Sequence, residues 1–166
     1  MFDLEDVRKE YLRLDQLCRV DTSKIILGVN ARTVRRRGQC TTQSGVPVRV
    51  EISEFVFHEP AESFLNTIRH EYAHALAAIR TGRAHGHDAQ WRKACQEIGC
   101  NGSRTSKASV AQNEKMRQQA RYTIACCGCG NEFQRFRKTK FISLLETGQK
   151  HSYRCVHCNS EDFKLK

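Results

Sequence analysis

The sequence lacks any apolar run long enough to cross a membrane, so we expect neither a transmembrane helix nor a membrane partner. We also expect no secretory leader, because residues 1–6 are acidic where a leader would be basic. We therefore expect a cytoplasmic protein, associated with the nucleoid or, in a eukaryotic cell, nuclear. In such a reducing compartment, nine cysteines are better explained by metal binding than by disulfide bonds.

Acidic residues are scarce beside basic ones. The chain has 28 Lys and Arg residues against 18 Asp and Glu residues, which gives a net charge of +10. Residues 101–166 carry +8 of this excess and residues 1–100 only +2. Such a balance favours an anionic partner, and nucleic acid fits it better than a membrane surface. The length of 166 residues suits one ordinary domain, or one small domain with an appendage.

Periodicity in the first half of the chain predicts a small α+β domain. Apolar residues recur with helical spacing over residues 3–18 and again over residues 60–82. Three strand-like runs lie between them, at 24–30, 38–43 and 46–53. A Ser-Gly pair at 44–45 joins the last two runs, and we expect a short antiparallel sheet packed against the second helix. The arginine triplet at 35–37 suits either a solvated turn or a phosphate contact.

The helix at 60–82 carries a His-Glu-x-x-His motif. His70 and His74 lie one turn apart, so both imidazoles project from one face and can hold one metal ion. The apolar stripe lies roughly on the other side of the helix, which keeps the metal side and the packing side apart. Glu71 is not needed as a ligand, and a carboxylate beside zinc can take a proton from water. The motif therefore predicts a catalytic zinc site with Glu71 as the general base.

Zinc needs a third protein ligand, and the residues after the motif restrict the choice. The metzincin pattern would place glycine and histidine where this chain has Ala77 and Arg80, so that class is excluded. We expect His87 to be the third ligand. It directly precedes Asp88, which reads as the start of a further helix, and a ligand at a helix mouth is held rigidly. The competing candidates are His85 and, more weakly, Glu97.

The last segment contains two Cys-x-x-Cys pairs, which are a strong zinc signal. The expected ligands of this structural zinc ion are Cys126, Cys129, Cys155 and Cys158. Cys127 is excluded as a ligand, because the Cys-x-x-Cys spacing followed by Gly130 selects its neighbour Cys126 instead. The surrounding sequence would form a zinc ribbon too small to fold without metal, with strands at 121–125, 132–137, 151–155 and 162–165.

Basic and aromatic residues are interleaved within the predicted ribbon. Basic side chains can bind backbone phosphates while neighbouring rings stack on exposed bases. We expect single-stranded or junction-like DNA to contact Arg135, Arg137, Lys138 and Lys140. The neighbouring aromatic residues are Phe133, Phe136 and Phe141. The alternative is that the ribbon is only a structural appendage and that these rings form its core.

The order of these features resembles the SprT-like family of zinc metalloproteases, whose eukaryotic members include Spartan. The resemblance covers most of the chain. It rests on the N-terminal helix, an Ile-Leu-Gly strand, a Val-Glu-Ile-Ser strand, the motif from His70 to His74, the Gly-His-Asp-Ala-Gln-Trp stretch at 86–91 and the cysteine ribbon. Family members carry a third zinc histidine in a similar stretch, which maps onto His87, although Asp88 stands where the family often has glycine. The resemblance implies a DNA-linked protease, since Spartan-type members degrade proteins crosslinked to DNA.

We therefore predict a monomeric zinc-dependent endopeptidase that acts on DNA-associated or DNA-crosslinked protein and holds two zinc ions, one catalytic and one structural. The predicted parts are a SprT-like domain at 1–105, a helical connector at 106–120 and a zinc ribbon at 121–166. Two other functions stay open, a non-catalytic zinc-stapled DNA-binding module and a regulatory protease of the phage-repressor type. The intact Glu71 argues against the first. The missing helix-turn-helix and carboxylate third ligand argue against the second.

Overall fold

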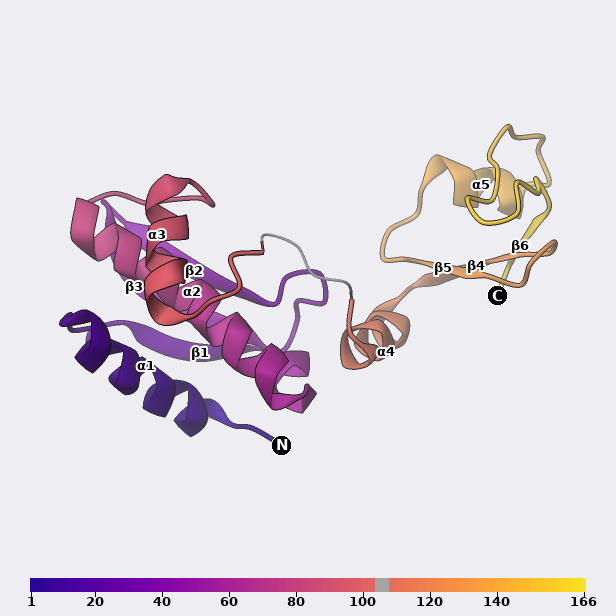
Figure 1. The fold of residues 1–166 in the computed structure, drawn as a ribbon. Helices are drawn as coiled ribbons and strands as arrows, with labels where there is room; N and C mark the ends of the chain where they lie inside the picture. The colour runs from indigo at the N-terminus through magenta and orange to yellow at the C-terminus, as the bar shows by residue number, and fades with distance from the viewer. Residues whose placement is uncertain (104–107) are drawn as a thin grey trace. The chain divides into compact units, whose positions relative to one another are not determined.

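The computed structural model describes residues 1–103 and 108–166, which form two compact units, Met1–Asn113 and Glu114–Lys166. In the first unit the elements are α1 (Leu4–Cys18), β1 (Ile26–Asn30), β2 (Gly38–Gln43), β3 (Val46–Ser53), the 3₁₀ helix η1 (Glu54–His58), α2 (Ala61–Thr81) and α3 (Ala89–Ile98) (Figure 1). The helix α4 (Val110–Gln119) contains the division between the units, and β4 (Tyr122–Cys126), β5 (Glu132–Arg135), α5 (Lys140–Glu146) and β6 (Phe163–Leu165) follow. The boundary predicted between residues 105 and 106 lies outside the described residues. No helix within the described ranges combines the length and the apolar character needed to span a membrane.

The helix predicted at 3–18 is confirmed as α1, and its N-terminal cap explains where it begins. The Asp3 side chain accepts hydrogen bonds from the backbone N–H groups of Glu5 and Asp6, at 2.8 and 3.1 Å. The Asp6 side chain accepts one from the Asp3 backbone at 3.0 Å. This reciprocal capping box satisfies N–H groups that have no partner inside the helix. The apolar face packs into the core through Val7, Tyr11, Leu14 and Cys18.

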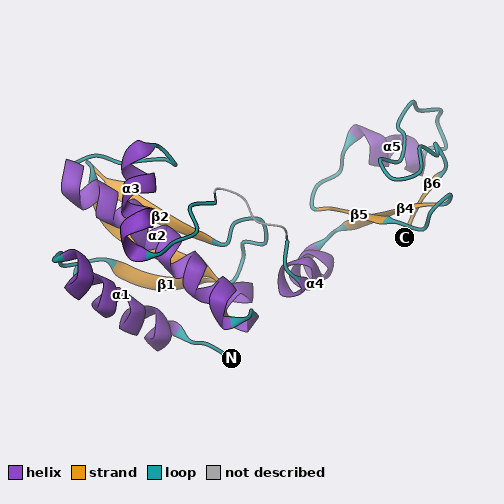
Figure 2. Cartoon of the chain, in the orientation of Figure 1, coloured by secondary structure: helices purple, strands orange, loops and turns teal. Residues whose placement is uncertain are grey.

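The three strands of the first unit, drawn in orange in Figure 2, belong to one sheet. Their order in the sheet is β1-β3-β2. β2 and β3 make the predicted antiparallel hairpin, in which Gln43 pairs with Val46. The two turn residues, Ser44 and Gly45, have φ angles of 51° and 83°, as a two-residue type I′ turn requires. β1 runs parallel to β3, so the prediction of a purely antiparallel sheet is wrong for this strand. β3 is the central strand, and β2 lies on the side of β3 that faces away from β1. The chain therefore passes from β1 to the opposite edge strand, β2, before it forms β3, which runs in the same direction as β1.

α2 packs across β2 and β3 and supplies much of the core (Figure 2). Its fully buried large side chains are Phe64, Ile68, Tyr72 and Leu76. The Tyr72 hydroxyl donates to the Asp15 carboxylate of α1 at 2.8 Å, which ties the two helices together. The helix ends at Gly82, whose φ of 70° and N–H bond to the Ala78 carbonyl at 2.8 Å close the last turn. The core thus fixes the helix that carries the His-Glu-x-x-His motif.

α3 begins directly after Asp88, as the sequence predicted. The Asp88 carboxylate accepts from the backbone N–H groups of Gln90 and Trp91, at 3.1 and 3.2 Å. Trp91, one turn into the helix, is fully buried between α3 and α2. The cap and this ring hold the residues just before α3 close to α2.

The second unit is a three-stranded antiparallel sheet in the order β5-β4-β6, with α5 packed on β6. The predicted strands at 121–125, 132–137 and 162–165 correspond to β4, β5 and β6. Residues 151–155 form no strand, so that prediction is wrong. In this stretch His151 and Tyr153 pack on the ring of Phe141 in α5, with centroid distances of 4.8 and 4.4 Å. Aromatic packing on a helix therefore replaces strand pairing there.

Candidate metal centre

Three histidines converge where α2 faces the residues before α3. His70 and His74 come from α2, and His87 comes from the turn that leads into α3. One ring nitrogen from each histidine lies within 4.8 Å of the other two, and the Nε2 atoms of His70 and His87 are 3.0 Å apart. Ligand nitrogens around a tetrahedral zinc ion, each about 2.0–2.1 Å from the metal, lie about 3.3 Å from one another. The arrangement fits a metal ion held by three imidazoles.

The ring of His74 is oriented by a backbone group. Its Nδ1 atom lies 3.0 Å from the carbonyl oxygen of His85, so Nδ1 carries the proton and Nε2 is left for a metal. Burial lowers the pKa of His74 to about 4, and the neighbouring rings of His70 and His87 act in the same direction, against the bond to His85. His74 is therefore neutral at physiological pH, which is the form that binds metals.

The competing candidates for the third ligand are engaged elsewhere. The side chain of His85 is 1% exposed, with Nε2 at 2.6 Å from the Thr81 hydroxyl and Nδ1 at 2.8 Å from the Asp88 carboxylate. Glu97 makes a two-pronged ion pair with Arg80, at 2.6 and 2.8 Å. Neither belongs to the group of three histidines found among the described residues. The geometry thus favours His87 over both alternatives.

Trp91 packs against all three histidines. Its ring centroid lies 4.8 Å from that of His70, 5.5 Å from His74 and 4.5 Å from His87. The indole Nε1–H donates to the His70 carbonyl oxygen at 3.4 Å. One buried ring thus limits the rotamers of the whole ligand set, and it gives the site an apolar wall.

Glu71 lies next to the histidines, buried between α2 and the edge strand β2. It is 5% exposed, and its carboxylate accepts a hydrogen bond from the backbone N–H of Cys40. Burial raises the pKa of Glu71 to about 7, although His70 and the Cys40 bond pull it down. A buried carboxyl group is costly for a fold, so its place beside the three histidines makes Glu71 a candidate functional residue.

A groove of about 1400 Å³ opens along α2 in front of these residues. Its walls include His70, Glu71, His74 and His87, together with parts of 35–39, 60–69 and 99–103. Gly38 and Gln39 at the start of β2 face this groove, and β2 is one of the two edge strands of its sheet. The groove therefore brings an open strand edge, a candidate base and a candidate metal site together.

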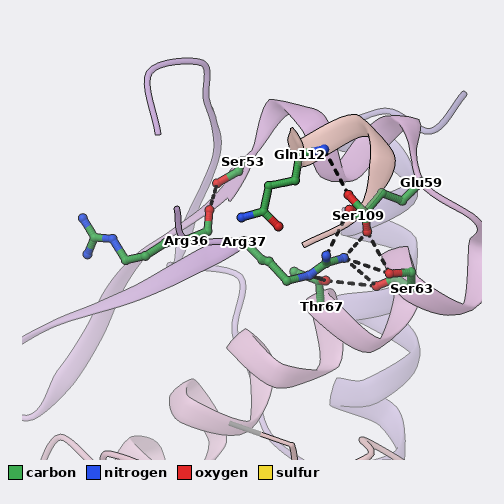
Figure 3. Close-up of polar contacts among 8 residues, drawn as sticks. All are labelled: Arg36, Arg37, Ser53, Glu59, Ser63, Thr67, Ser109 and Gln112. Atoms are coloured by element: carbon green, nitrogen blue, oxygen red, sulfur yellow. Dashed lines mark hydrogen bonds and ion pairs between the residues drawn. The ribbon is translucent and has the colours of Figure 1, made fainter. Parts of the chain in front are cut away.

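Arg37 is directed into a buried polar cluster beside this groove (Figure 3). Its guanidinium binds the Glu59 carboxylate, with one N–O distance of 3.0 Å, and the hydroxyls of Ser63 and Thr67 at 2.9 and 3.0 Å. Burial alone would raise the pKa of Glu59, but hydrogen bonds from Arg37, Ser109 and Ser63 outweigh it and lower the pKa. Arg37 thus fits neither alternative for the arginine triplet, because it links the start of β2 to α2.

The side chain of Arg36 points in the opposite direction from that of Arg37 (Figure 3). Its side chain is exposed and donates to the Gln39 amide oxygen at 2.8 Å, while its carbonyl accepts from the Ser53 hydroxyl at 2.5 Å. Arg35 and Arg36 both line the groove. A phosphate contact stays a prediction for these two residues.

The second unit brings its four predicted cysteines together. The sulfur atoms of Cys126 and Cys158 lie 3.5 Å apart, and those of Cys129 and Cys155 lie 3.6 Å apart. Sulfurs at about 2.3 Å from a tetrahedral zinc ion would be about 3.8 Å apart, so the set fits such an ion. Cys127 is exposed and does not belong to this group.

The two halves of the cysteine site are built alike. In each half, the residue after the second cysteine has a left-handed backbone conformation, and its N–H group donates to the carbonyl oxygen of the first cysteine. Gly130, with φ of 73°, donates to Cys126 at 2.9 Å, and Asn159, with φ of 62°, donates to Cys155 at 2.8 Å. Glycine and asparagine are the residues that adopt this conformation most readily. Their position after each Cys-x-x-Cys pair therefore shapes both knuckles.

The predicted DNA-contact residues Arg135, Arg137, Lys138 and Lys140 are all exposed. Lys138 forms an ion pair with Glu146 at 2.6 Å, and Arg135 donates to the Gln134 carbonyl at 2.9 Å. The three nearby phenylalanines are half-buried rather than exposed. The ring of Phe133 stacks on that of His157, with centroids 6.0 Å apart. Their contact with DNA stays a prediction.

Some groups that hold the site could not be expected from residue types. The carbonyl of His85 and the N–H of Cys40 are backbone groups, so no side-chain signal marks them. No sequence motif marks Gly38 either, although it lies against Glu71 in the folded chain. A glycine at the start of a strand opposite the motif helix was the one visible hint, since strands disfavour glycine.

The first unit is an α+β domain with three histidines and a buried glutamate on one groove, an arrangement that could hold a metal ion beside a carboxyl group. The chain belongs to the SprT-like family, whose model matches residues 7–120. The matched region contains the histidines and Glu71 and ends before the cysteine site. No curated protein matches the chain.

Proposed function

We propose that this protein is a zinc-dependent endopeptidase of the SprT-like type that acts on DNA-associated or DNA-crosslinked proteins. His70, His74 and His87 would hold the catalytic zinc ion. Cys126, Cys129, Cys155 and Cys158 would hold a second, structural one. The observation that carries the proposal is the buried carboxyl of Glu71 beside three convergent imidazoles.

The chain's own residues account for a hydrolytic reaction. Zinc bound at the three histidines would act as a Lewis acid toward the scissile carbonyl and would make water a stronger acid. Glu71 accepts the proton of the attacking water and later delivers it to the leaving amine. A nearby divalent cation also favours the ionised form of a buried carboxyl group, which keeps Glu71 able to accept that proton.

The edge strand β2 suits an extended protein substrate. β2 pairs with β3 on one side, and its first residues line the groove that contains Glu71. A peptide can add to an exposed strand edge through main-chain hydrogen bonds, with pockets reading alternate side chains. This mode would place a scissile bond beside the histidines without requiring a particular sequence, which suits an enzyme for varied proteins.

The association with DNA rests on charge and on the family resemblance. The segment 101–166 carries +8, and the ribbon exposes Arg135, Arg137, Lys138 and Lys140. Four thiolates around one divalent ion add about −2, so a positive excess remains after metal binding. A basic ribbon on the same chain as the protease unit would bring it to proteins on DNA.

The test is Glu71→Gln, which keeps the volume and removes the base. The zinc-loaded variant should bind as much metal as wild type but lose proteolysis by about 100-fold or more, the scale of a general base. Cleavage of an unstructured protein and autocleavage are measured with and without single-stranded DNA. Glu114→Gln makes the same chemical change on an exposed face of α4 and should leave the rate unchanged.

Two results would contradict the proposal. If Glu71→Gln cleaves as fast as wild type, the assignment of the base is wrong. If the zinc-loaded wild type cleaves nothing under either condition, the non-catalytic DNA-binding module becomes the better function.

A further inference from the structure

Gly38 lies directly against the side chain of Glu71. It is the first residue of β2, and it pairs with Ile52 of β3. A Cβ atom at residue 38 would lie 2.6 Å from Cγ, 2.7 Å from Oε1 and 2.9 Å from Cδ of Glu71. All three distances are shorter than the van der Waals contact of about 3.5–4.0 Å. The space that any other residue would fill at this position is therefore occupied by Glu71.

The backbone does not itself require glycine at residue 38. Gly38 is not among the residues with positive φ, so an L-residue could adopt its conformation without strain. Gly28, in β1, offers a direct comparison within the same sheet. A Cβ there would approach Arg49 Nη1 and Glu51 Cγ only to 3.9 and 4.0 Å, which is ordinary contact. The need for glycine at residue 38 comes from the side chain of Glu71.

The same strand also holds the carboxylate by a hydrogen bond. Cys40, two residues after Gly38, donates its backbone N–H to Glu71. Glu71 is 5% exposed, so its side chain cannot swing into solvent without breaking this bond and opening the core. β2 thus fixes Glu71 twice, by the missing Cβ of Gly38 and by the N–H of Cys40.

We propose that Gly38 is a positioning residue for Glu71, which sets where the base stands relative to the metal ligands. The catalytic part of this inference rests on the proposed peptidase function, whereas the structural part does not. With alanine at residue 38, the carboxyl group is displaced while His70, His74 and His87 keep their own supports on α2 and before α3. The substitution therefore changes the position of the Glu71 carboxyl group and leaves the three histidines in place.

The experiment uses the zinc-loaded full chain and a double-mutant cycle. Gly38→Ala is made in wild type and in Glu71→Ala, and Gly28→Ala is the matched control in both backgrounds. Gly38→Ala should lower the melting temperature of wild type. In Glu71→Ala it should leave the melting temperature unchanged or raise it, because the methyl group enters the space that Glu71 has left. Gly28→Ala should have the same effect in both backgrounds, since its Cβ is far from Glu71.

Two further readouts separate positioning from general damage. Gly38→Ala should keep the wild-type zinc content, and it should lower kcat by about 100-fold at nearly unchanged KM, the scale of a misplaced catalytic group. Gly28→Ala should keep both kinetic constants.

The inference is overturned if Gly38→Ala shifts the melting temperature equally in the two backgrounds, or if the variant is as active as wild type. A wild type without proteolysis would remove the peptidase function, and the melting cycle would still decide whether Gly38 places Glu71.

Discussion

His74 Nδ1 lies 3.0 Å from the backbone carbonyl of His85, two residues before His87. One short turn therefore supplies both the carbonyl group that orients His74 on α2 and the third histidine of the group. The side chain of His85 holds this turn in place through Thr81 and Asp88. Because Asp88 also caps α3, the start of that helix and the geometry of the candidate metal centre depend on each other.

The first prediction separates His87 from His85. His87→Ala should release the zinc ion of the first unit, because two imidazoles remain of three. His85→Ala keeps the backbone carbonyl and loses only the anchor of the turn, so it should keep the ion with an affinity lowered by roughly tenfold. Zinc content and competition with a chelating dye measure both effects. Loss of the ion in His85→Ala with retention in His87→Ala would reverse the assignment.

The second prediction concerns stoichiometry. The purified wild type should hold two zinc ions per chain, one in each ligand set. Cys155→Ser should lower the content to one and unfold only the second unit, since a ribbon of this size depends on its metal. Cys127→Ser makes the same change beside the ligand set and should keep two ions. A single ion in the wild type would remove one of the two sites.

The third prediction concerns the ion pair between Arg37 and Glu59. Glu59 is 5% exposed and Arg37 is 19% exposed at its side chain, so removal of one partner leaves a charge without its counterpart. Arg37→Met should cost about 3–5 kcal/mol of unfolding free energy, whereas the double variant Arg37→Met/Glu59→Gln should cost clearly less. Chemical denaturation of wild type, Arg37→Met, Glu59→Gln and the double variant measures the coupling. Additive losses would show that the pair does not act as a unit.

The pH dependence of that stability follows from the lowered pKa of Glu59. A carboxyl group whose pKa is lower in the folded than in the unfolded state stabilises the fold above the unfolded pKa. That contribution is lost as the pH falls through the folded value. Glu59→Gln should therefore show a shallower loss of stability in acid than wild type.

The fourth prediction concerns DNA. The zinc-loaded chain should bind single-stranded DNA with an affinity that falls steeply as salt rises. Arg137→Ala and Lys140→Ala should each flatten the log–log salt slope by about 0.7 for every phosphate that is no longer neutralised. Lys138→Ala should change the slope less, because Glu146 already neutralises this lysine at 2.6 Å. Absence of binding at low salt would leave the ribbon with a structural role only.

Spacing in the sequence was enough to predict that the histidines of α2 lie together and that each Cys-x-x-Cys pair does, because one helical turn and a Cys-x-x-Cys knuckle are local geometries. The Asp88 cap and the Ser44–Gly45 turn were likewise readable, because their residues favour those conformations. The parallel pairing of β1 could not be read, since a strand's own pattern does not name its neighbour. The packing of Gly38 on Glu71 joins residues 33 positions apart and exists only in the folded chain.

Trp91 is the single tryptophan of the chain, and its ring touches all three histidines. Indole emission from this protein therefore arises at one place, beside the three histidines of the candidate metal centre. Zinc has a filled d shell and should leave that emission bright. Exchange for Cu²⁺ or Co²⁺, whose open d shells quench excited rings at short range, should dim it. With zinc bound at the histidines as proposed, the time course of Trp91 emission would therefore follow exchange of that ion in solution without any added dye.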